Sequence, residues 1–128
     1  MSNPTKVYLA GHTGLVGTAI HRALLRNGFE NIITKTSEKL DLTDQLATES
    51  FIARESPGII IVSAALVGGI QANAARPADF LYQNLLIASN VIHSAWQNRV
   101  PRLLFLGSSC IYPKDCPPPI REHDLLTG

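Results

Sequence analysis

Three glycines at intervals of three residues, Gly11, Gly14 and Gly17, constrain this chain more than any other feature. They join a short apolar segment, residues 6–10, to residues 15–27, where apolar side chains recur at helical spacing. Gly11 permits a tight turn, Gly14 lets another group approach the backbone, and Gly17 allows a helix to lie close to the strand. The pattern therefore predicts a β-strand, a glycine turn and an α-helix in one unit.

The rest of the chain alternates short apolar segments with longer segments of helical periodicity, which predicts βαβ units and a parallel sheet. The further expected strands are residues 31–34, 59–63 and 102–106, to which residues 40–42 could add a very short one. The further expected helices run from Thr43 or Asp44 to Arg54 or Glu55, and from Pro77 to around Asn98, with a glycine-containing loop at residues 67–73. The predicted fold class is α/β, a Rossmann-type doubly wound parallel sheet.

A chain of 128 residues has room for one domain with one core. After residue 106 the periodicity is lost, and the prolines at 117–119 exclude a helix or a central strand. We expect residues 1–128 to form the N-terminal part of a Rossmann domain, incomplete because later strands and a substrate domain are absent. Trp96 is expected to pack in the core or on a partner surface.

Composition excludes several classes of protein. Hydrophobic residues make up 45% of the chain and charged residues 16%, and the net charge is +1 with no basic cluster. Neither a nucleic acid nor a membrane is therefore expected as a partner, and the apolar runs are too short to cross a bilayer. Two cysteines cannot define a disulfide framework, and the four histidines lack ligand-like spacing. We expect a cytoplasmic protein without a metal site.

The glycine turn is placed to bind a dinucleotide. A diphosphate at the start of the following helix would meet free N–H groups and the positive end of the helix dipole. The strand before the turn and the helix after it are the context that this interpretation requires, and a chance glycine-rich turn is the alternative. Asp41 is placed to meet the adenine edge, or equally to cap the helix that follows.

The end of the second predicted strand distinguishes NADP(H) from NAD(H). A carboxylate there would bind the ribose 2′-hydroxyl and repel a 2′-phosphate. Lys35 leads this segment and the first acid is delayed to Glu38, which favours NADP(H). The alternative is that Lys35 and Lys39 are solvated surface lysines.

Small polar residues follow the last predicted strand, at Gly107, Ser108, Ser109 and Cys110. Ligands of open α/β sheets bind beyond the carboxyl ends of the strands, so these side chains are expected to face the cofactor crevice. A hydroxyl there can stabilise the alkoxide that hydride transfer creates, and a thiol of lowered pKa can act as a base. Taken alone, a cysteine in this position is more commonly a buried, inert thiol.

Several segments together resemble the GDP-L-fucose synthases, a family of extended short-chain dehydrogenases. The resemblance runs from about Lys6 to Gly128, and the segments that carry it are LLFLGSSCIYPK at 103–114, AGHTG at 10–14, AALVGGIQAN at 64–73, and residues 77–80 with Asn84. It implies an enzyme that uses NADPH for 3,5-epimerisation and 4-keto reduction of a GDP-4-keto-6-deoxy-mannose, a nucleotide-sugar substrate, and that is a homodimer when complete.

The resemblance also implies roles for individual residues. Ser108 would polarise the C4 carbonyl, Cys110 would be the epimerisation base, and residues 67–69 with Asn73 would lie near cofactor or substrate. The whole region 37–42 is implied to line the cofactor. The residues implied to bind it are Gly11, His12, Thr13, Gly14, Leu15, Val16, Gly17, Lys35, Ser37, Asp41, Leu42, Ala64, Leu106, Gly107 and Ser109. The family usually carries Arg in place of Thr13 and a basic residue near Ser37, so the preference for NADP(H) depends largely on Lys35.

The Tyr-x-x-x-Lys pair of short-chain dehydrogenases is missing from this chain. Its tyrosine would deliver a proton and its lysine would lower the tyrosine pKa, but Tyr8, Tyr82 and Tyr112 are followed four residues later by His, Leu and Cys. We therefore expect a fragment or truncated product that is inactive alone. Two alternatives remain: another NAD(P)-dependent nucleotide-sugar epimerase or dehydratase, and a dinucleotide-binding module without catalysis.

Overall fold

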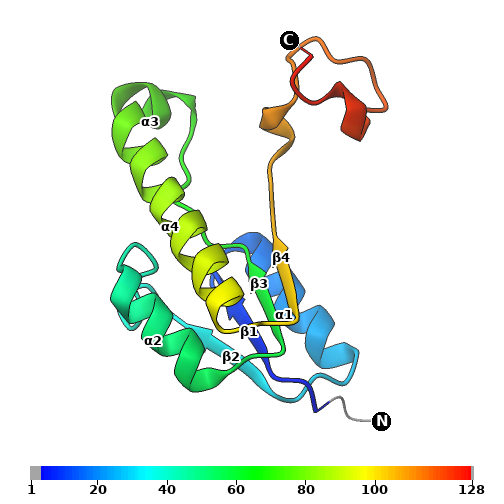
Figure 1. Ribbon diagram of the computed structural model, residues 1–128. Helices are drawn as coiled ribbons and strands as arrows, with labels where there is room; N and C mark the ends of the chain where they lie inside the picture. The colour runs from blue at the N-terminus through cyan, green and yellow to red at the C-terminus, as the bar shows by residue number, and fades with distance from the viewer. Residues whose placement is uncertain (1–3, 128) are drawn as a thin grey trace.

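The computed structural model describes residues 4–127 and contains one parallel sheet with helices on both faces. The strands are β1 (Val7–Ala10), β2 (Ile32–Lys35), β3 (Ile59–Val62) and β4 (Arg102–Phe105), in the order β2-β1-β3-β4. The helices are α1 (Leu15–Arg26), α2 (Gln45–Glu55), α3 (Ile70–Ala75) and α4 (Pro77–Gln97), followed by 3₁₀ turns at Ser109–Ile111 and Glu122–Asp124 (Figure 1). The strand order reverses at β1, which confirms the doubly wound α/β prediction.

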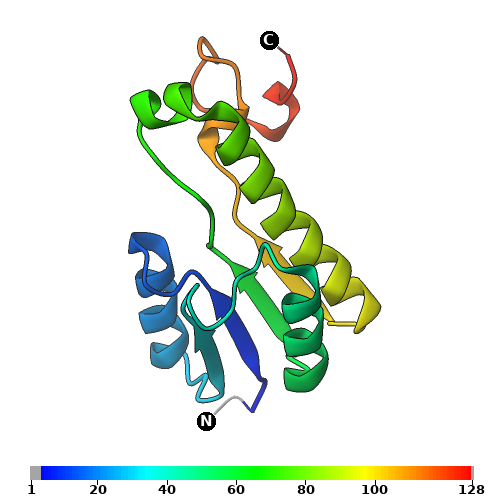
Figure 2. The same cartoon turned by 90° about the vertical axis from the view of Figure 1, so that its left-hand side faces the viewer.

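The sheet divides the core into two layers, and helices cover each of them. Val7, Leu9 and Ile61 pack on one face of the sheet, where Ile20 and Leu24 of α1 cover them. Alternate residues of the same strands point to the opposite face, which α2 and α4 cover (Figure 2). Strands β1 and β3 are therefore apolar throughout, as a strand buried on both faces requires.

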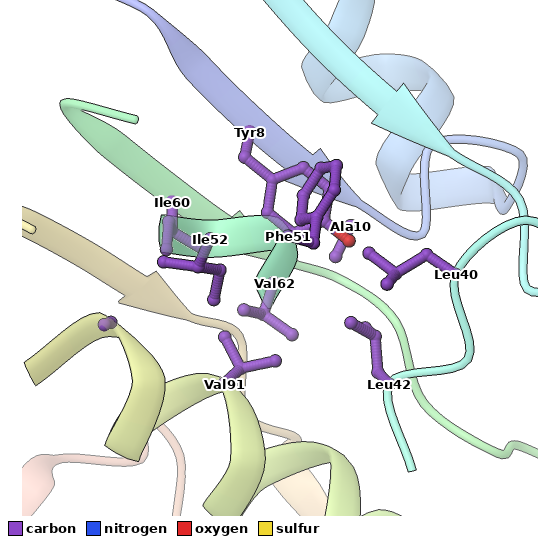
Figure 3. Close-up of a cluster of buried hydrophobic side chains, with 10 residues drawn as sticks. Tyr8, Ala10, Leu40, Leu42, Phe51, Ile52, Ile60, Val62 and Val91 are labelled. Carbon is purple, nitrogen blue, oxygen red and sulfur yellow. The ribbon is translucent and has the colours of Figure 1, made fainter. Parts of the chain in front are cut away.

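The larger cluster lies between the sheet and the pair α2 and α4. Figure 3 shows Tyr8, Phe51, Val62 and Val91 pointing toward one another. The rings of Tyr8 and Phe51 pack edge to face, with their centroids 4.8 Å apart. Burial raises the pKa of the Tyr8 hydroxyl, so this group stays protonated. Tyr8 therefore serves as a core residue.

Residues 40–42 do not form the short strand that their apolar character allowed. They belong to the loop between β2 and α2, and the side chains of Leu40 and Leu42 are buried in the larger cluster. The apolar signal thus arose from burial of a loop. Asp44 caps α2 by accepting a hydrogen bond from the N–H of Ala47 at 2.9 Å, which selects it over Thr43 as the cap.

One expectation in the second half of the chain is corrected, and the alternatives left for another are reduced to one. The predicted loop at 67–73 contains most of α3, which begins after Gly69 and ends before Pro77 starts α4, because proline lacks the N–H that a continuing helix needs. Of the two places expected for Trp96, the core is excluded, because its side chain is 75% exposed.

Strand β4 forms an exposed edge of the sheet. It pairs with β3 on one side only, and α1 does not reach across to cover it. Leu104 is consequently half exposed although its neighbour in register, Ile61, is buried. Among residues 4–127, no helix is long and apolar enough to span a bilayer.

Candidate functional site

A cavity of about 620 Å³ opens at the carboxyl ends of β1, β2 and β3. The reversal of strand order at β1 leaves a crevice there, as in other doubly wound sheets. Its walls come from the glycine turn with the first turn of α1, the end of β2 with the loop that follows, the segment after β3, and α4. The lining residues are Gly11, Thr13, Gly14, Leu15, Val16, Gly17, Lys35, Thr36, Ser37, Leu40, Asp41, Leu42, Thr43, Ser63, Ala64, Ala65, Leu66, Val67, Gln83 and Ile87.

The glycine turn is held so tightly that side chains cannot be accommodated at two positions. Gly11 has φ +82°, and a Cβ there would lie 2.6 Å from the N of Ala64. A Cβ on Gly17 would overlap the carbonyl oxygen of Gly11. The hydroxyl of Ser63 donates to the carbonyl of Ala10 at 2.8 Å and so ties the end of β3 to the start of the turn. Strand, turn and helix are thereby fixed as one body.

The start of α1 offers free backbone donors to the cavity. The first hydrogen bond of the helical pattern runs from Thr18 N to Gly14 O, so the N–H groups of residues 15–17 have no acceptor within the helix. No side chain caps this end, where the N-cap residue is Gly14. A cradle of bare N–H groups beside a residue without Cβ fits a diphosphate.

The end of β2 brings a cation and hydroxyls to the cavity. Lys35, Thr36 and Ser37 line it, whereas Glu38, the first acid after β2, does not. The Oγ1 atom of Thr36 is buried and has no hydrogen-bond partner. A buried unpaired hydroxyl is costly unless a ligand satisfies it, so this corner fits a polar group of a ligand.

Asp41 also lines the cavity, but its carboxylate makes hydrogen bonds within its own loop. Its Oδ1 accepts from the backbone N of Thr43 at 2.9 Å and from the Thr43 hydroxyl at 2.7 Å. The alternative that Asp41 caps α2 is wrong, since Asp44 is the N-cap. Asp41 instead shapes the turn that presents Leu42 and Thr43 to the cavity.

An asparagine of α4 anchors the wall that follows β3. The Oδ1 of Asn84 accepts from the backbone N of Leu66 at 2.8 Å, and its Nδ2 donates to the Leu66 carbonyl at 3.0 Å. The side chain thus pairs with Leu66 as a neighbouring strand would, in a segment that belongs to no strand. This pairing fixes residues 64–67 against α4.

Most of the residues predicted to bind a cofactor line this cavity: Gly11, Thr13, Gly14, Leu15, Val16, Gly17, Lys35, Ser37, Asp41, Leu42 and Ala64. His12, Leu106, Gly107 and Ser109 do not line it. The Nδ1 of His12 is buried and has no hydrogen-bond partner among the described residues.

The prediction missed Thr36, Thr43, Ser63, Ala65, Leu66, Gln83 and Ile87 as lining residues. Ser63 could have been found, because it is a small polar residue at the end of a buried strand. Gln83 and Ile87 carried no such signal, because the packing of α4 decides which of its faces meets the cavity.

Ser108 and Cys110 follow β4 at the same edge of the sheet but do not line the cavity. The Ser108 Oγ accepts from the backbone N of Cys110 at 3.2 Å and caps the short 3₁₀ turn. Cys110 is exposed, contrary to the buried thiol that a cysteine alone would suggest. Figure 1 shows this segment extending beyond the carboxyl edge of the sheet.

The second cysteine differs in its surroundings. Cys116 is half buried, and desolvation together with the Asp124 carboxylate, which accepts a hydrogen bond from the thiol, raises its pKa. Cys116 is therefore poorly suited to supply a thiolate. Within the described part of the chain, no three His, Cys, Asp or Glu side chains gather where they could hold a metal ion.

Comparison with known proteins places this chain in one protein family. Residues 7–128 match the NAD dependent epimerase/dehydratase family. The chain is 57% identical to GDP-L-fucose synthase 1 of Arabidopsis thaliana over 123 residues, which are 96% of this chain and 38% of that protein. The chain thus spans well under half the length of this relative.

Solved structures agree with this placement. DdhaC superposes with a TM-score of 0.96 at 47% identity, over 100% of this chain and 37% of that one. MlghC, a GDP-mannoheptose C4 reductase from Campylobacter jejuni with NADP bound, superposes with a TM-score of 0.92 at 41% identity, over 100% of this chain and 38% of that one.

The glycine contacts predict different outcomes for two alanine variants. Gly17→Ala should lower the free energy of unfolding by about 2 kcal/mol or more, because its Cβ would overlap backbone of the turn. Gly14→Ala should cost well under half of that, since its Cβ would lie 3.5 Å from Gly11 O, an ordinary contact. Urea unfolding followed by circular dichroism measures both, and equal losses would contradict the packing described.

Proposed function

Because this chain belongs to the NAD dependent epimerase/dehydratase family, we propose that it binds NADP(H) as the cofactor-binding region of a GDP-L-fucose synthase-like enzyme. The reaction proposed is 3,5-epimerisation and 4-keto reduction of GDP-4-keto-6-deoxy-mannose. The observation that carries the proposal is the cavity whose wall combines bare N–H groups of the glycine turn with Lys35 at the end of β2. The identity to a GDP-L-fucose synthase supports the substrate class.

The residues present fit a 2′-phosphorylated dinucleotide. The diphosphate would lie against the amides of residues 15–17, where Gly14 leaves room for it. The 2′-phosphate would meet Lys35 and the hydroxyls of Thr36 and Ser37, with no carboxylate among these three to repel it. Lys35 would attract the phosphate by its positive charge. The phosphate would in turn accept a hydrogen bond from the Thr36 hydroxyl, which otherwise has no partner.

The chemistry is proposed for the segment after β4. NADPH, when bound, supplies the hydride for C4. The Ser108 hydroxyl would donate a hydrogen bond to the C4 carbonyl oxygen and stabilise the negative charge that develops there. The Cys110 thiolate would take the proton from the carbon next to the ketone. Both residues must come closer to the cavity than they lie in this structure, where they do not line it.

A second candidate is a C4 reductase without epimerisation. It is favoured by the likeness to MlghC, which is named a GDP-mannoheptose C4 reductase. In such an enzyme Ser108 keeps its part in polarising the carbonyl and Cys110 has none. A dinucleotide-binding module without catalysis remains a third candidate, and it would use the same cavity.

We further propose a homodimer in the cytoplasm. Helix α4 carries apolar side chains on the face opposite the core, Leu81, Leu85, Ile92 and Trp96, all more than 45% exposed. Their spacing of four, seven and four residues aligns them in one stripe, and a second copy of the stripe would cover it. The free thiols of Cys110 and Cys116 suit a reducing compartment.

The role of Lys35 can be tested by charge reversal. Lys35→Glu should weaken NADP⁺ binding about tenfold or more, equivalent to about 1.4 kcal/mol, and leave NAD⁺ binding unchanged or stronger. The reason is that Lys35 is the only Lys or Arg among the described residues that line the cavity. Isothermal titration calorimetry measures both affinities. Lys39→Glu is the matched control, because Lys39 is exposed in the loop that follows β2 and does not line the cavity. An equal loss in both variants would contradict the assignment.

The role of Cys110 can be tested in a chimera in which this chain replaces the matching region of the Arabidopsis GDP-L-fucose synthase 1. Cys110→Ser should abolish exchange of the C3 and C5 protons with deuterated solvent while C4 reduction continues. Cys116→Ser, the matched control, should leave both reactions intact. Loss of both activities in Cys110→Ser, or of neither, would contradict the proposed role, and a chimera that keeps Cys110 but reduces C4 without any proton exchange would favour the C4 reductase.

The proposed dimer makes a separate prediction. Leu85→Glu with Trp96→Glu should convert a dimer to a monomer in light scattering, since two charges would be buried in the interface. Leu46→Glu, on exposed α2 surface, should leave the mass unchanged. A monomeric wild type would disprove the dimer.

A further inference from the structure

Asn90 is a buried residue of α4 whose side chain reaches the loop between β2 and α2. Its Nδ2 donates to the carbonyl oxygen of Leu42 at 2.9 Å and to that of Thr43 at 3.1 Å. Both partners are acceptors, so the amide nitrogen must face them. These bonds join positions 48 and 47 residues apart in the chain, and they fix the distance between α4 and this loop.

The loop at residues 36–44 forms a wall of the cavity without belonging to the sheet. Its internal hydrogen bonds, such as Leu40 N to Thr36 O and Asp44 N to Asp41 O, fix its shape but not its position. The Thr48 hydroxyl lies 3.5 Å from the Leu42 oxygen, at the limit of a hydrogen bond. The short bonds from Asn90 therefore provide the directional attachment of this wall to α4.

The same helix also lines the cavity itself. Ile87, one turn before Asn90, lines the cavity together with Leu42, and residues three apart share one face of a helix. One helix thus supplies part of the wall and the attachment of another part. A flat ring that packs against both parts depends on their spacing, because a gap of about 0.5–1 Å forfeits roughly a quarter to a half of the contact energy.

We propose that Asn90 is a positioning residue that sets the width of the cavity for the adenine ring of the dinucleotide. It acts through Leu42 and Thr43 and does not itself line the cavity. This inference rests on the proposed binding of NADP(H). It assigns a part in that binding to α4, in addition to the glycine turn and the end of β2.

The test uses adenosine 2′,5′-bisphosphate, which carries the adenine and the 2′-phosphate. Asn90→Ala should bind it about tenfold more weakly than the wild-type chain, measured by calorimetry at a temperature where unfolding curves show the variant folded. Asn90→Ser, which keeps one short donor, should lose less. Ile52→Val is the matched control: it weakens the same core cluster away from the cavity and should bind as the wild type does.

The outcomes separate this inference from the proposed function. If the wild-type chain does not bind the bisphosphate, the proposed cofactor is overturned and the inference with it. If the wild type binds and the folded Asn90 variants bind equally well, only the positioning role is overturned. If Ile52→Val loses as much affinity, or if no Asn90 variant folds, Asn90 is a core residue and the positioning role is likewise overturned.

Discussion

The close approach of α1 to the end of β1 is the constraint on which the cavity depends. Gly17 packs on the carbonyl of Gly11, and Gly11 packs in turn on the backbone of Ala64. Three segments of backbone are thus in contact where side chains would keep them apart. As a result, the backbone N–H groups at the start of α1 are unpaired at the point where the strand order reverses. These unpaired donors are the most direct reason to assign an anionic ligand to this site.

Helix α4 organises the rest of the site. Its inner face contributes Val91 to the core and Ile87 to the cavity. Asn84 and Asn90 of the same helix bind the backbone of the two loops that form the adjoining walls. Loops outside a sheet lack ladder hydrogen bonds, so side chains must supply directional contacts in their place. A single rigid helix therefore correlates the positions of two loops that are distant in sequence.

The sequence predicted the fold well where the signal was local. The strand-turn-helix unit, the strand β3 and the extent of α1 each followed from residues adjacent in the chain. The prediction was wrong or left open where contacts distant in the chain decide burial. Residues 40–42 are apolar because a loop enters the core, and only packing decided that Trp96 is exposed on α4 and not buried in the core.

By itself the sequence determined the class of fold, the position of the glycine turn and the cation at the end of β2, because glycine spacing and strand ends are local properties. Only the tertiary structure showed that Gln83 and Ile87 reach the cavity and that Ser108 and Cys110 do not line it. It alone revealed the bonds from Asn90 to the loop. These facts depend on how helices rotate against the sheet, and that rotation is set by packing across the whole core.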